Sequence, residues 1–387
     1  MISPVLPSYS RANLSFVKGE GSWMIEADGR RFLDFTSGIA VMALGHGHPK
    51  IVETLKAQAD KLWHTSNLFE VPEQTALAER LAEHTFADTT FFCNSGTEAA
   101  ELAIKMARKY RDATGEPDRQ TILCFEGAFH GRSIAAISAA GQEKLVKGFG
   151  PLLPGFEQLP FGDHDAVAAA AARPDVGAIM VEPIQGESGI KPLSDACLKG
   201  LRDVCDEHGL LLILDEIQCG MGRTGKLFAH EWAGISPDIM LVAKGIGGGF
   251  PLGALLATEE AAKGMVAGTH GSTYGGNPLG CAVGGAVMDE VTAPGFLDAV
   301  NAKAGHLRQR LEGIVAANPD IFEEVRGAGL MIGVKCKIPN LDVVTAGHAQ
   351  DLLTVPAGDN VVRILPALTI TEEEINEGLR RFKAAAV

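Results

Sequence analysis

The sequence predicts an α/β protein with a large, mostly parallel sheet and a smaller α+β part. Strand-like apolar runs alternate with helical patterns between roughly residues 50 and 290. Two of these runs, 210–214 and 239–243, are continuously apolar, which is typical of parallel strands covered on both faces. We expect three segments: residues 1–50, which contribute to a small domain, a large α/β domain at 51–285, and the C-terminal small domain at 286–387.

Composition and charge limit the classes of function. The 387 residues are 46% hydrophobic and 21% charged, which suits a globular protein with a large core. The net charge of −14 argues against binding to nucleic acid or to an anionic membrane, because both need basic patches. The N-terminus lacks the pattern of a secretory signal, and no apolar run approaches the ~20 residues of a membrane span. We therefore expect a cytoplasmic protein without nucleic-acid or membrane partners.

Cysteine and histidine give little support for a metal site. The seven cysteines are scattered and form no Cys-x-x-Cys pair, so we expect free, buried thiols in a reducing compartment. His46 and His48 lie in a glycine-rich stretch, GHGHP, without a third ligand at a typical spacing. A loop role is favoured over a metal role there, and we expect no metal.

The elements can be placed in chain order. Residues 16–23 and 24–35 alternate polar and apolar positions around Asp28-Gly29, a hairpin signal. Further on, helical periodicity predicts helices over 49–62, 74–85, 99–111, 167–172, 195–208, 279–292, 296–318 and 372–383. Short apolar runs predict strands over 89–93, 121–125, 176–181, 210–214, 239–243, 253–257, 330–335 and 360–365.

Chemically active side chains follow five of these strands. They are Ser95-Gly96-Thr97, Phe129, the segment 182–187, Asp215 and Lys244. Because ligands of parallel α/β sheets gather beyond the carboxyl ends of the strands, these residues are expected at one site.

Each signal also has an ordinary explanation when taken alone. Ser95 and Glu98 form a capping-box pattern, and Gly96 opens the backbone of a helix N-terminus that could hold a phosphate. The same residues fit a strand-to-helix turn that binds nothing. Phe129 could stack on a flat ring and Arg132 could hold a carboxylate, but a core phenylalanine and a solvated arginine are commoner.

The combination is more specific than its parts. A lysine and an aspartate at strand ends are what pyridoxal 5'-phosphate (PLP) chemistry requires: an amine for a Schiff base and an acid for the pyridine nitrogen. The phosphate cradle and the aromatic plate complete the requirements. A dehydrogenase is disfavoured, because no Gly-x-Gly-x-x-Gly follows the first strand and the glycines at 245–249 come late, after a lysine.

Six sequence blocks resemble the motifs of class-III PLP-dependent aminotransferases. They are NSGTEA, FHGR, EPIQGE, LILDEIQ, AKGIGGG and STYGGNP. The family belongs to the PLP-dependent transferases of fold type I, the aspartate-aminotransferase-like superfamily. The resemblance covers nearly the whole chain, including GHGHP near the start and VRGAGLMIG near the end.

The resemblance implies PLP as cofactor and a role for a residue in each block. Lys244 would be the catalytic residue, which binds PLP covalently and then shuttles a proton once desolvation has lowered its usual pKa of ~10. Asp215 would keep the pyridine nitrogen protonated, Gln218 would touch the 3′ oxygen and Phe129 would lie over the ring. The remaining cofactor contacts are expected from Ser95, Gly96, Thr97, Ile217 and Thr273, the last reaching the phosphate of the partner subunit in a homodimer.

The resemblance also implies how two unlike substrates share one site. Arg132 would hold the α-carboxylate of the amine donor, which points the far amine at the cofactor. Arg363 would hold the 1-carboxylate of 2-oxoglutarate, and Glu187 would neutralise Arg363 while the donor is bound. Ser272 would lie near the substrate beside Thr273.

Within the class, the short length and the stretch from Gly38 to Pro49 are most similar to members that act on N2-acetyl-L-ornithine in arginine biosynthesis. The implied reaction transfers its terminal amine to 2-oxoglutarate, giving N-acetyl-L-glutamate 5-semialdehyde and L-glutamate. Members that use ornithine or other ω-amino acids share most of the blocks, and succinyldiaminopimelate is a further possible donor. Met42 departs from the small or polar residue usual in relatives and bears on fine specificity.

A non-catalytic protein that kept the fold is the remaining alternative. The presence of Lys244, Asp215 and both arginines argues against it.

Overall fold

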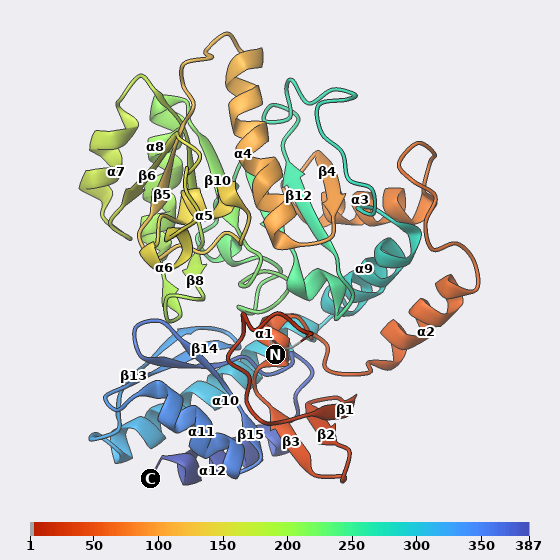
Figure 1. Cartoon of the computed structure of the whole chain (residues 1–387), viewed down its shortest axis with the longest axis vertical. Helices are drawn as coiled ribbons and strands as arrows, with labels where there is room; N and C mark the ends of the chain where they lie inside the picture. Colours follow the sequence, from red (N-terminus) through yellow and green to blue (C-terminus); the bar gives the residue numbers. More distant parts are fainter. Residues whose placement is uncertain (1–3, 387) are drawn as a thin grey trace.

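A computed structural model describes residues 4–386, which form two layers (Figure 1). The upper layer holds a seven-stranded sheet whose strands are, in spatial order, β4 (Thr89–Cys93), β12 (Gly253–Ala257), β11 (Ile239–Val242), β10 (Leu211–Asp215), β7 (Val176–Val181), β5 (Thr121–Phe125) and β6 (Phe156–Leu159). Only β12 runs against the others, since it pairs antiparallel with both β11 and β4. The α/β class with a mostly parallel sheet is confirmed.

The continuous apolar runs of the sequence are buried because helices cover both faces of this sheet. In β10, Leu211 and Ile213 pack with α4 (Gly96–Ala113) and α5 (Ile134–Ala140), whereas Leu212 and Leu214 pack with α7 (His164–Ala171) and α8 (Asp195–His208). On the second face, α3 (Pro72–His84) and α9 (Pro278–Val291) cover β4, β12 and β11. Burial on both faces explains why polar alternation is missing from these strands.

The lower layer is α+β. Its main sheet is antiparallel, with the order β13 (Phe322–Ala328), β14 (Met331–Cys336), β17 (Val361–Ile364) and β16 (Val355–Ala357). Three helices accompany it: α10 (Phe296–Ala317), α11 (Asn340–Ala349) and α12 (Glu372–Ala385). A second sheet contains β1 (Phe16–Glu20), β2 (Trp23–Glu26), β3 (Arg31–Asp34) and β15 (Leu352–Leu353).

The two ends of the chain share one hydrophobic core. Strand β15 pairs parallel with β3, and Leu33 and Phe35 are buried beside Leu307 of α10 and Phe382 of α12. The blue C-terminal part and the red N-terminal strands accordingly lie side by side in Figure 1. Strands β1 to β3 therefore pack in the lower layer, while the three predicted segments, 1–50, 51–285 and 286–387, stay predictions.

The remaining elements are short or connect the layers. They are α1 (Ser37–Ala40), α2 (Pro49–Ala59), α6 (Glu143–Val146), β8 (Ile184–Gln185), β9 (Lys191–Pro192) and the 3₁₀ helices η1 (Ala229–Trp232) and η2 (Lys244–Gly247). Within residues 4–386, no helix is long and apolar enough to cross a membrane.

Several helices begin earlier than apolar periodicity predicts. Helix α3 begins at Pro72 and α9 at Pro278, where proline's fixed φ suits the first turn and its missing N–H leaves no donor unpaired. Helix α4 begins at Gly96 instead of residue 99, since Ser95 is its N-cap. Apolar periodicity detects only the turns that place apolar residues on the buried face. A first turn that is polar or begins with proline is therefore not detected.

A close helix–strand contact in the lower layer can be tested by substitution. A Cβ atom on Gly378 of α12 would overlap the ring of Phe35, so Gly378→Ala should destabilise the protein by about 1–3 kcal/mol, the usual effect of overpacking. Gly313→Ala in α10 is the control, because a Cβ there meets no atom within 4 Å and the helix gains propensity. Thermal unfolding should show a lower Tm for the first variant only; equal Tm values would contradict the packing.

Candidate active site

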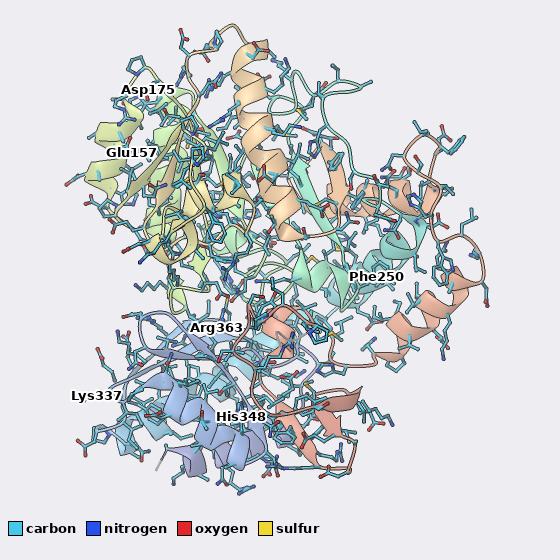
Figure 2. All side chains as sticks on the ribbon, viewed as in Figure 1. Glu157, Asp175, Phe250, Lys337, His348 and Arg363 are labelled. Atoms are coloured by element: carbon cyan, nitrogen blue, oxygen red, sulfur yellow. The ribbon has the colours of Figure 1, made fainter. Side chains whose placement is uncertain are left out.

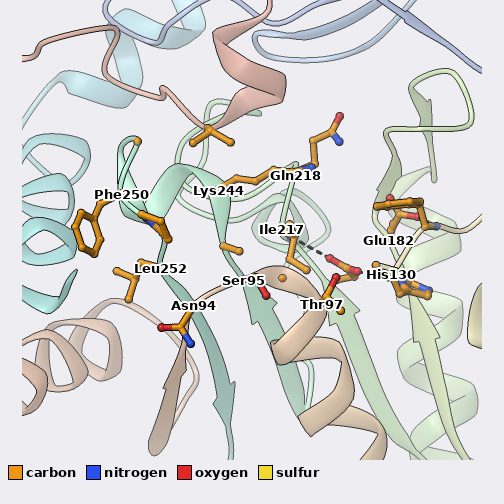
Figure 3. A pocket seen from close by; sticks show the side chains of 18 residues that line it. Asn94, Ser95, Thr97, His130, Glu182, Ile217, Gln218, Lys244, Phe250 and Leu252 are labelled. Carbon is orange, nitrogen blue, oxygen red and sulfur yellow. Dashed lines mark hydrogen bonds and ion pairs between the residues drawn. The ribbon is translucent and has the colours of Figure 1, made fainter. Parts of the chain in front are cut away.

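A cavity of about 330 Å³ opens at the carboxyl edge of the large sheet. Figure 3 shows Lys244 and Gln218 on one side of it, Ser95 and Thr97 at the N-terminus of α4, and Glu182 with His130 at the far end. Eight residues singled out in the sequence line it: Ser95, Gly96, Thr97, Phe129, Asp215, Ile217, Gln218 and Lys244. These eight residues come from four strand ends, those of β4, β5, β10 and β11, and Glu182 adds the end of β7.

The first turn of α4 forms an anion cradle. The Ser95 hydroxyl accepts a hydrogen bond from the Glu98 N–H (3.3 Å), and the Glu98 carboxylate accepts one from the Asn94 N–H (2.7 Å). The N–H groups of Gly96 and Thr97 are left without intrahelical acceptors, as in every first helical turn. A Cβ on Gly96 would lie 2.6 Å from Cδ1 of Ile217, so glycine is required for this close packing. The free N–H groups, more than the engaged Ser95 hydroxyl, are suited to a phosphate.

Asp215 ends β10 as a buried carboxylate held by two donors. Its Oδ1 accepts a hydrogen bond from the Ile217 N–H (3.1 Å), and its Oδ2 lies 2.8 Å from Nδ1 of His130. Burial lowers the pKa of His130, but the hydrogen bond and charge of Asp215 outweigh burial and the pKa is raised. The imidazole and the Ile217 N–H therefore fix the orientation of the Asp215 carboxyl group in the cavity wall.

Lys244 follows β11 at the start of η2 and combines strain with desolvation. Its φ is 49°, in the left-handed region that side chains other than glycine rarely adopt. Burial lowers the pKa of its amine; Glu187 opposes this shift and Arg363 adds to it. Within residues 4–386 its Nζ forms no hydrogen bond or ion pair, so the amine is available to a ligand in the cavity.

Glu182 joins two segments of the cavity wall. Its Oε1 accepts a hydrogen bond from the Phe129 N–H (2.8 Å), and its Oε2 accepts one from the Gly186 N–H (3.3 Å). Burial, with the nearby charge of Asp215, raises the pKa of this carboxyl to about 7. One side chain therefore positions both the aromatic plate and the segment that leads to Glu187.

Glu187 and Arg363 form an ion pair behind Gln218. Both guanidinium Nη atoms contact the Glu187 carboxylate, and the Nη2 to Oε2 distance is 3.3 Å. Arg363, which comes from β17 of the lower layer, also donates to Oε1 of Gln218 (3.4 Å) and lies near the boundary between the layers (Figure 2). Burial raises the pKa of Glu187, but the charge and hydrogen bonds of Arg363, the charge of Lys244 and a hydrogen bond with Gln218 together outweigh burial, and the pKa is lowered. The pair does not line the cavity itself; Gln218 links it to the cavity.

Arg132 lies at the cavity rim and is exposed. Its guanidinium carbon is 5.5 Å from the centroid of the Phe129 ring, and its backbone N–H donates to Oγ1 of Thr97 (3.3 Å). Within the described residues it has no carboxylate partner, so its charge is free to meet an anionic ligand.

Ser272 and Thr273 are not brought to the cavity of their own chain. The Ser272 hydroxyl accepts hydrogen bonds from the Gly275 N–H (2.9 Å) and from Nδ2 of Asn94 (3.4 Å). Thr273 lines a separate small crevice that also includes His64. Their loop lies between β12 and α9, on the rim of the upper layer.

Sequence reasoning gave no role to several residues that shape the cavity. His130 and Glu182 each belong to a motif that follows a strand, and this position is the sequence feature that could have assigned them to the site. Val41 and Phe250 also line the cavity, but neither carries a chemical group that a pattern could have singled out.

Comparison with known proteins identifies the family. The class-III aminotransferase model matches residues 7–386. The chain belongs to the class-III aminotransferases. This class-III aminotransferase is 66% identical over 386 residues to the acetylornithine aminotransferase of Rhodobacter capsulatus, covering 100% of the chain and 98% of the relative. It is 56% identical to the enzyme of that name from Brucella melitensis, covering 99% and 95%.

Solved structures agree on the fold. The ornithine aminotransferase of Toxoplasma gondii superposes with a TM-score of 0.96 at 32% identity, covering 99% of this chain and 92% of that one. The N-acetylornithine aminotransferase of Stenotrophomonas maltophilia superposes with a TM-score of 0.85 at 40% identity, covering 97% and 96%. The fold is therefore that of the PLP-dependent transferases of fold type I.

The class-III aminotransferases are PLP-dependent transaminases, and the cavity fits their cofactor. The free N–H groups of Gly96 and Thr97 suit its phosphate, the buried Asp215 suits its pyridine nitrogen, and the unpaired Lys244 amine suits its aldehyde. The protein is a PLP-dependent transaminase.

The pKa of Glu182 gives a prediction about stability and pH. Because its value of about 7 in the folded protein lies above the ordinary 4.5, the folded state holds this proton more tightly than the unfolded chain. The resulting stabilisation is complete below pH ~4.5 and is lost as the pH rises through ~7. When the pH is raised from about 5 to about 8, the Tm of Glu182→Gln should therefore fall less than the Tm of the wild type.

The exposed Glu143 supplies the control. Glu143→Gln should follow the wild-type dependence of Tm on pH. Parallel curves for Glu182→Gln and the wild type would show that Glu182 does not titrate in this range.

Proposed function

We propose that this transaminase transfers the δ-amine of N2-acetyl-L-ornithine to 2-oxoglutarate, giving N-acetyl-L-glutamate 5-semialdehyde and L-glutamate in arginine biosynthesis. The observation that carries the proposal is the 66% identity, over the whole chain, to a relative named acetylornithine aminotransferase. Two arginines of different environment, one exposed and one paired with Glu187, support a site that handles two dissimilar carboxylates.

Four parts of the cavity would hold the cofactor. Gly96 and Thr97, with Ser95 as their cap, would bind the phosphate through N–H groups, and Asp215, supported by His130, would pair with the pyridine nitrogen. Phe129 and Ile217 would enclose the ring from its two faces, and Gln218 would contact its 3′ oxygen. When bound, PLP supplies an electron-accepting ring that stabilises negative charge on the substrate carbon.

Lys244 would be the catalytic residue. Its Nζ would first hold the cofactor and then take a proton from the substrate carbon and return it. The lowered pKa increases the fraction of neutral amine near neutral pH, and only the neutral amine can accept a proton. The left-handed backbone at this position directs the side chain from the strand end into the cavity.

The two carboxylate-binding sites would be used in turn. Exposed Arg132, beside the Phe129 ring, would hold the α-carboxylate of acetylornithine, so that its terminal amine reaches the cofactor. Glu187 would neutralise Arg363 during this half-reaction. In the second half-reaction the ion pair would open, and Arg363 would bind the 1-carboxylate of 2-oxoglutarate bidentately.

The enzyme would work in the cytoplasm as a homodimer. Thr273 lies away from the cavity of its own chain and its loop is on the rim of the upper layer, which supports a contact with the phosphate in the partner subunit. Ser272, held beside it, would lie near the partner's substrate. Aromatic and aliphatic side chains are exposed on the neighbouring segment and loop, among them Trp63, Phe69 and Tyr274, as expected for a surface that is covered by a second copy.

Ornithine is a second candidate donor, since the ornithine aminotransferase of Toxoplasma gondii superposes with a TM-score of 0.96. Its sequence identity of 32% is far below the 66% identity to the acetylornithine aminotransferase of Rhodobacter capsulatus, so acetylornithine is preferred.

A donor panel tests the assignment. With 2-oxoglutarate as acceptor, kcat/KM for acetylornithine should exceed that for ornithine and 4-aminobutyrate by about tenfold or more, equivalent to ~1.4 kcal/mol of transition-state binding. Succinyldiaminopimelate, measured in the same panel, shows whether the acyl group may be longer. A preference for ornithine would overturn the assignment. Lys244→Ala is the control and should lack both turnover and the absorbance above ~400 nm of a PLP-bound lysine.

The proposed role of Glu187 can be measured as a selectivity. Glu187→Gln leaves the charge of Arg363 unopposed, so donors that react through the α-amine, such as glutamate, should gain relative to acetylornithine by about tenfold in kcat/KM. Glu324→Gln, which alters an exposed ion pair with Arg326, is the matched control. Unchanged discrimination in the Glu187 variant would remove the switch.

A further inference from the structure

A second cavity lies between the upper layer and helix α10. Its volume is about 330 Å³, equal to that of the active-site cavity, and the two share no lining residue. Its walls come from Ile184 and Leu198 of the upper layer and from Ala304 and Arg308 of α10. Volumes near 300 Å³ with mostly apolar walls are typical of sites for small molecules.

The apolar part of this cavity could hold a flat or branched hydrophobic group. Trp232, at the end of η1, lines it, and the residue is 45% exposed. The indole is fixed in place, because its Nε1 donates to the Thr224 carbonyl (3.2 Å) and Lys226 lies over the ring, 5.2 Å from its centroid. Leu198 and Ala304 are buried beside it and extend the apolar surface.

A buried hydroxyl in the same cavity lacks a partner. Thr224 lines the cavity, is 1% exposed, and its Oγ1 forms no hydrogen bond with any described residue. Leaving such a group unpaired costs about 1–3 kcal/mol. Its oxygen is covered by protein atoms, so a ligand in the cavity reaches it only if the Thr224 side chain rotates.

Two opposite charges flank the cavity. Arg308 donates from Nη2 to the Gly327 carbonyl (2.6 Å) and from Nη1 to the Val325 carbonyl (3.5 Å), and it has a long ion pair with Glu312 (3.6 Å). A guanidinium has five N–H donors, so some remain for a ligand. Asp195, in the first turn of α8, also lines the cavity; it is exposed and forms no ion pair within residues 4–386. A cation and an anion in the lining of one cavity match a zwitterion.

We propose that this cavity is a second binding site, which takes a free α-amino acid with a large apolar side chain. The side chain would pack on Trp232 and Leu198, the α-carboxylate would pair with Arg308, and the α-ammonium would pair with Asp195. The Thr224 hydroxyl would donate to the carboxylate. The ligand would thereby join the upper layer to α10, next to the segment that runs from Glu182 to Glu187.

The experiment uses the PLP-bound enzyme and three probes that differ in charge: L-phenylalanine, phenylacetate and phenethylamine. Isothermal titration should detect L-phenylalanine, with binding at least tenfold weaker for the two singly charged probes. Equal binding of phenylacetate or phenethylamine, or no binding of L-phenylalanine, would overturn the proposal.

Two glycines of α10 allow a substitution that fills the cavity and a matched control substitution outside it. Gly305 lines the cavity and Gly313 does not, and a Cβ at either position meets no atom within 4 Å. Gly305→Trp should fill the cavity and weaken L-phenylalanine at least tenfold, whereas Gly313→Trp should leave its affinity unchanged. If Gly305→Trp binds L-phenylalanine as the wild type does, the ligand occupies another site, such as the active site, and the proposal is wrong.

Thr224→Val adds a readout that a purely structural role would not give. Removing an unpaired buried hydroxyl should leave Tm unchanged or raise it, while the affinity for L-phenylalanine falls severalfold. A variant with wild-type affinity would exclude Thr224 from the site and contradict the proposal. These titrations do not depend on which amine donor the enzyme prefers, so their failure is distinguishable from failure of the proposed function.

Discussion

Parallel pairing of β10 with β7 and β11 is the constraint on which the site depends. The register places Leu214 opposite Val181 and Asp215 opposite Leu241, so the three strands end at nearly the same height in the sheet. The residues that follow each strand must then converge on one edge. Glu182, Asp215 and Lys244 meet there because of backbone hydrogen bonding, without any contact among their side chains.

The antiparallel strand β12 contributes differently. It enters the sheet at the edge where the others leave it, so Phe250 and Leu252 reach the cavity from the strand's N-terminal side. A sheet with one reversed strand therefore closes the cavity on the side of β11, next to Lys244.

Electrostatic compensation allows so many charged groups to be buried together. Each buried carboxylate accepts hydrogen bonds from groups fixed by the fold: Asp215 from Ile217 and His130, Glu182 from two backbone N–H groups, and Glu216 from the N–H groups of Ala229 and His230. Lys244 is the exception in the cavity, since its amine is desolvated without a fixed partner. The buried acids are stabilised by fixed hydrogen-bond donors, whereas the Lys244 amine has no fixed partner. The amine therefore stays reactive.

Much of this arrangement could be predicted from the sequence. Asp215 and Lys244 follow uninterrupted apolar runs, and such runs locate strand ends to within one residue. Ser95 and Glu98 carried a capping pattern that specifies a helix start. Strand ends and helix starts can be predicted in this way because they depend on the residues next to them in the sequence.

Contacts between distant segments could not be predicted in the same way. The His130–Asp215 and Glu182–Phe129 contacts join residues from different strands, and which ring nitrogen or N–H faces a carboxylate depends on packing. Strand β13 and helix α11 also escaped prediction, because β13 is half exposed and α11 has no clear apolar stripe. Nothing in a pattern shows that Thr273 lies outside its own chain's cavity or that the Thr224 hydroxyl is unpaired.

The pairing of β15 with β3 has a consequence for biosynthesis. The large sheet uses strands from residue 89 to residue 257, so it can assemble while the chain is still being made, whereas β3 must wait for a partner more than 300 residues later. Until then Leu33 and Phe35 have no core to enter. Contacts of such high sequence separation form slowly, and an incomplete chain exposes apolar surface that promotes aggregation. In the nascent chain, the apolar residues of the first strands therefore stay without their core for longer than those of the largest sheet.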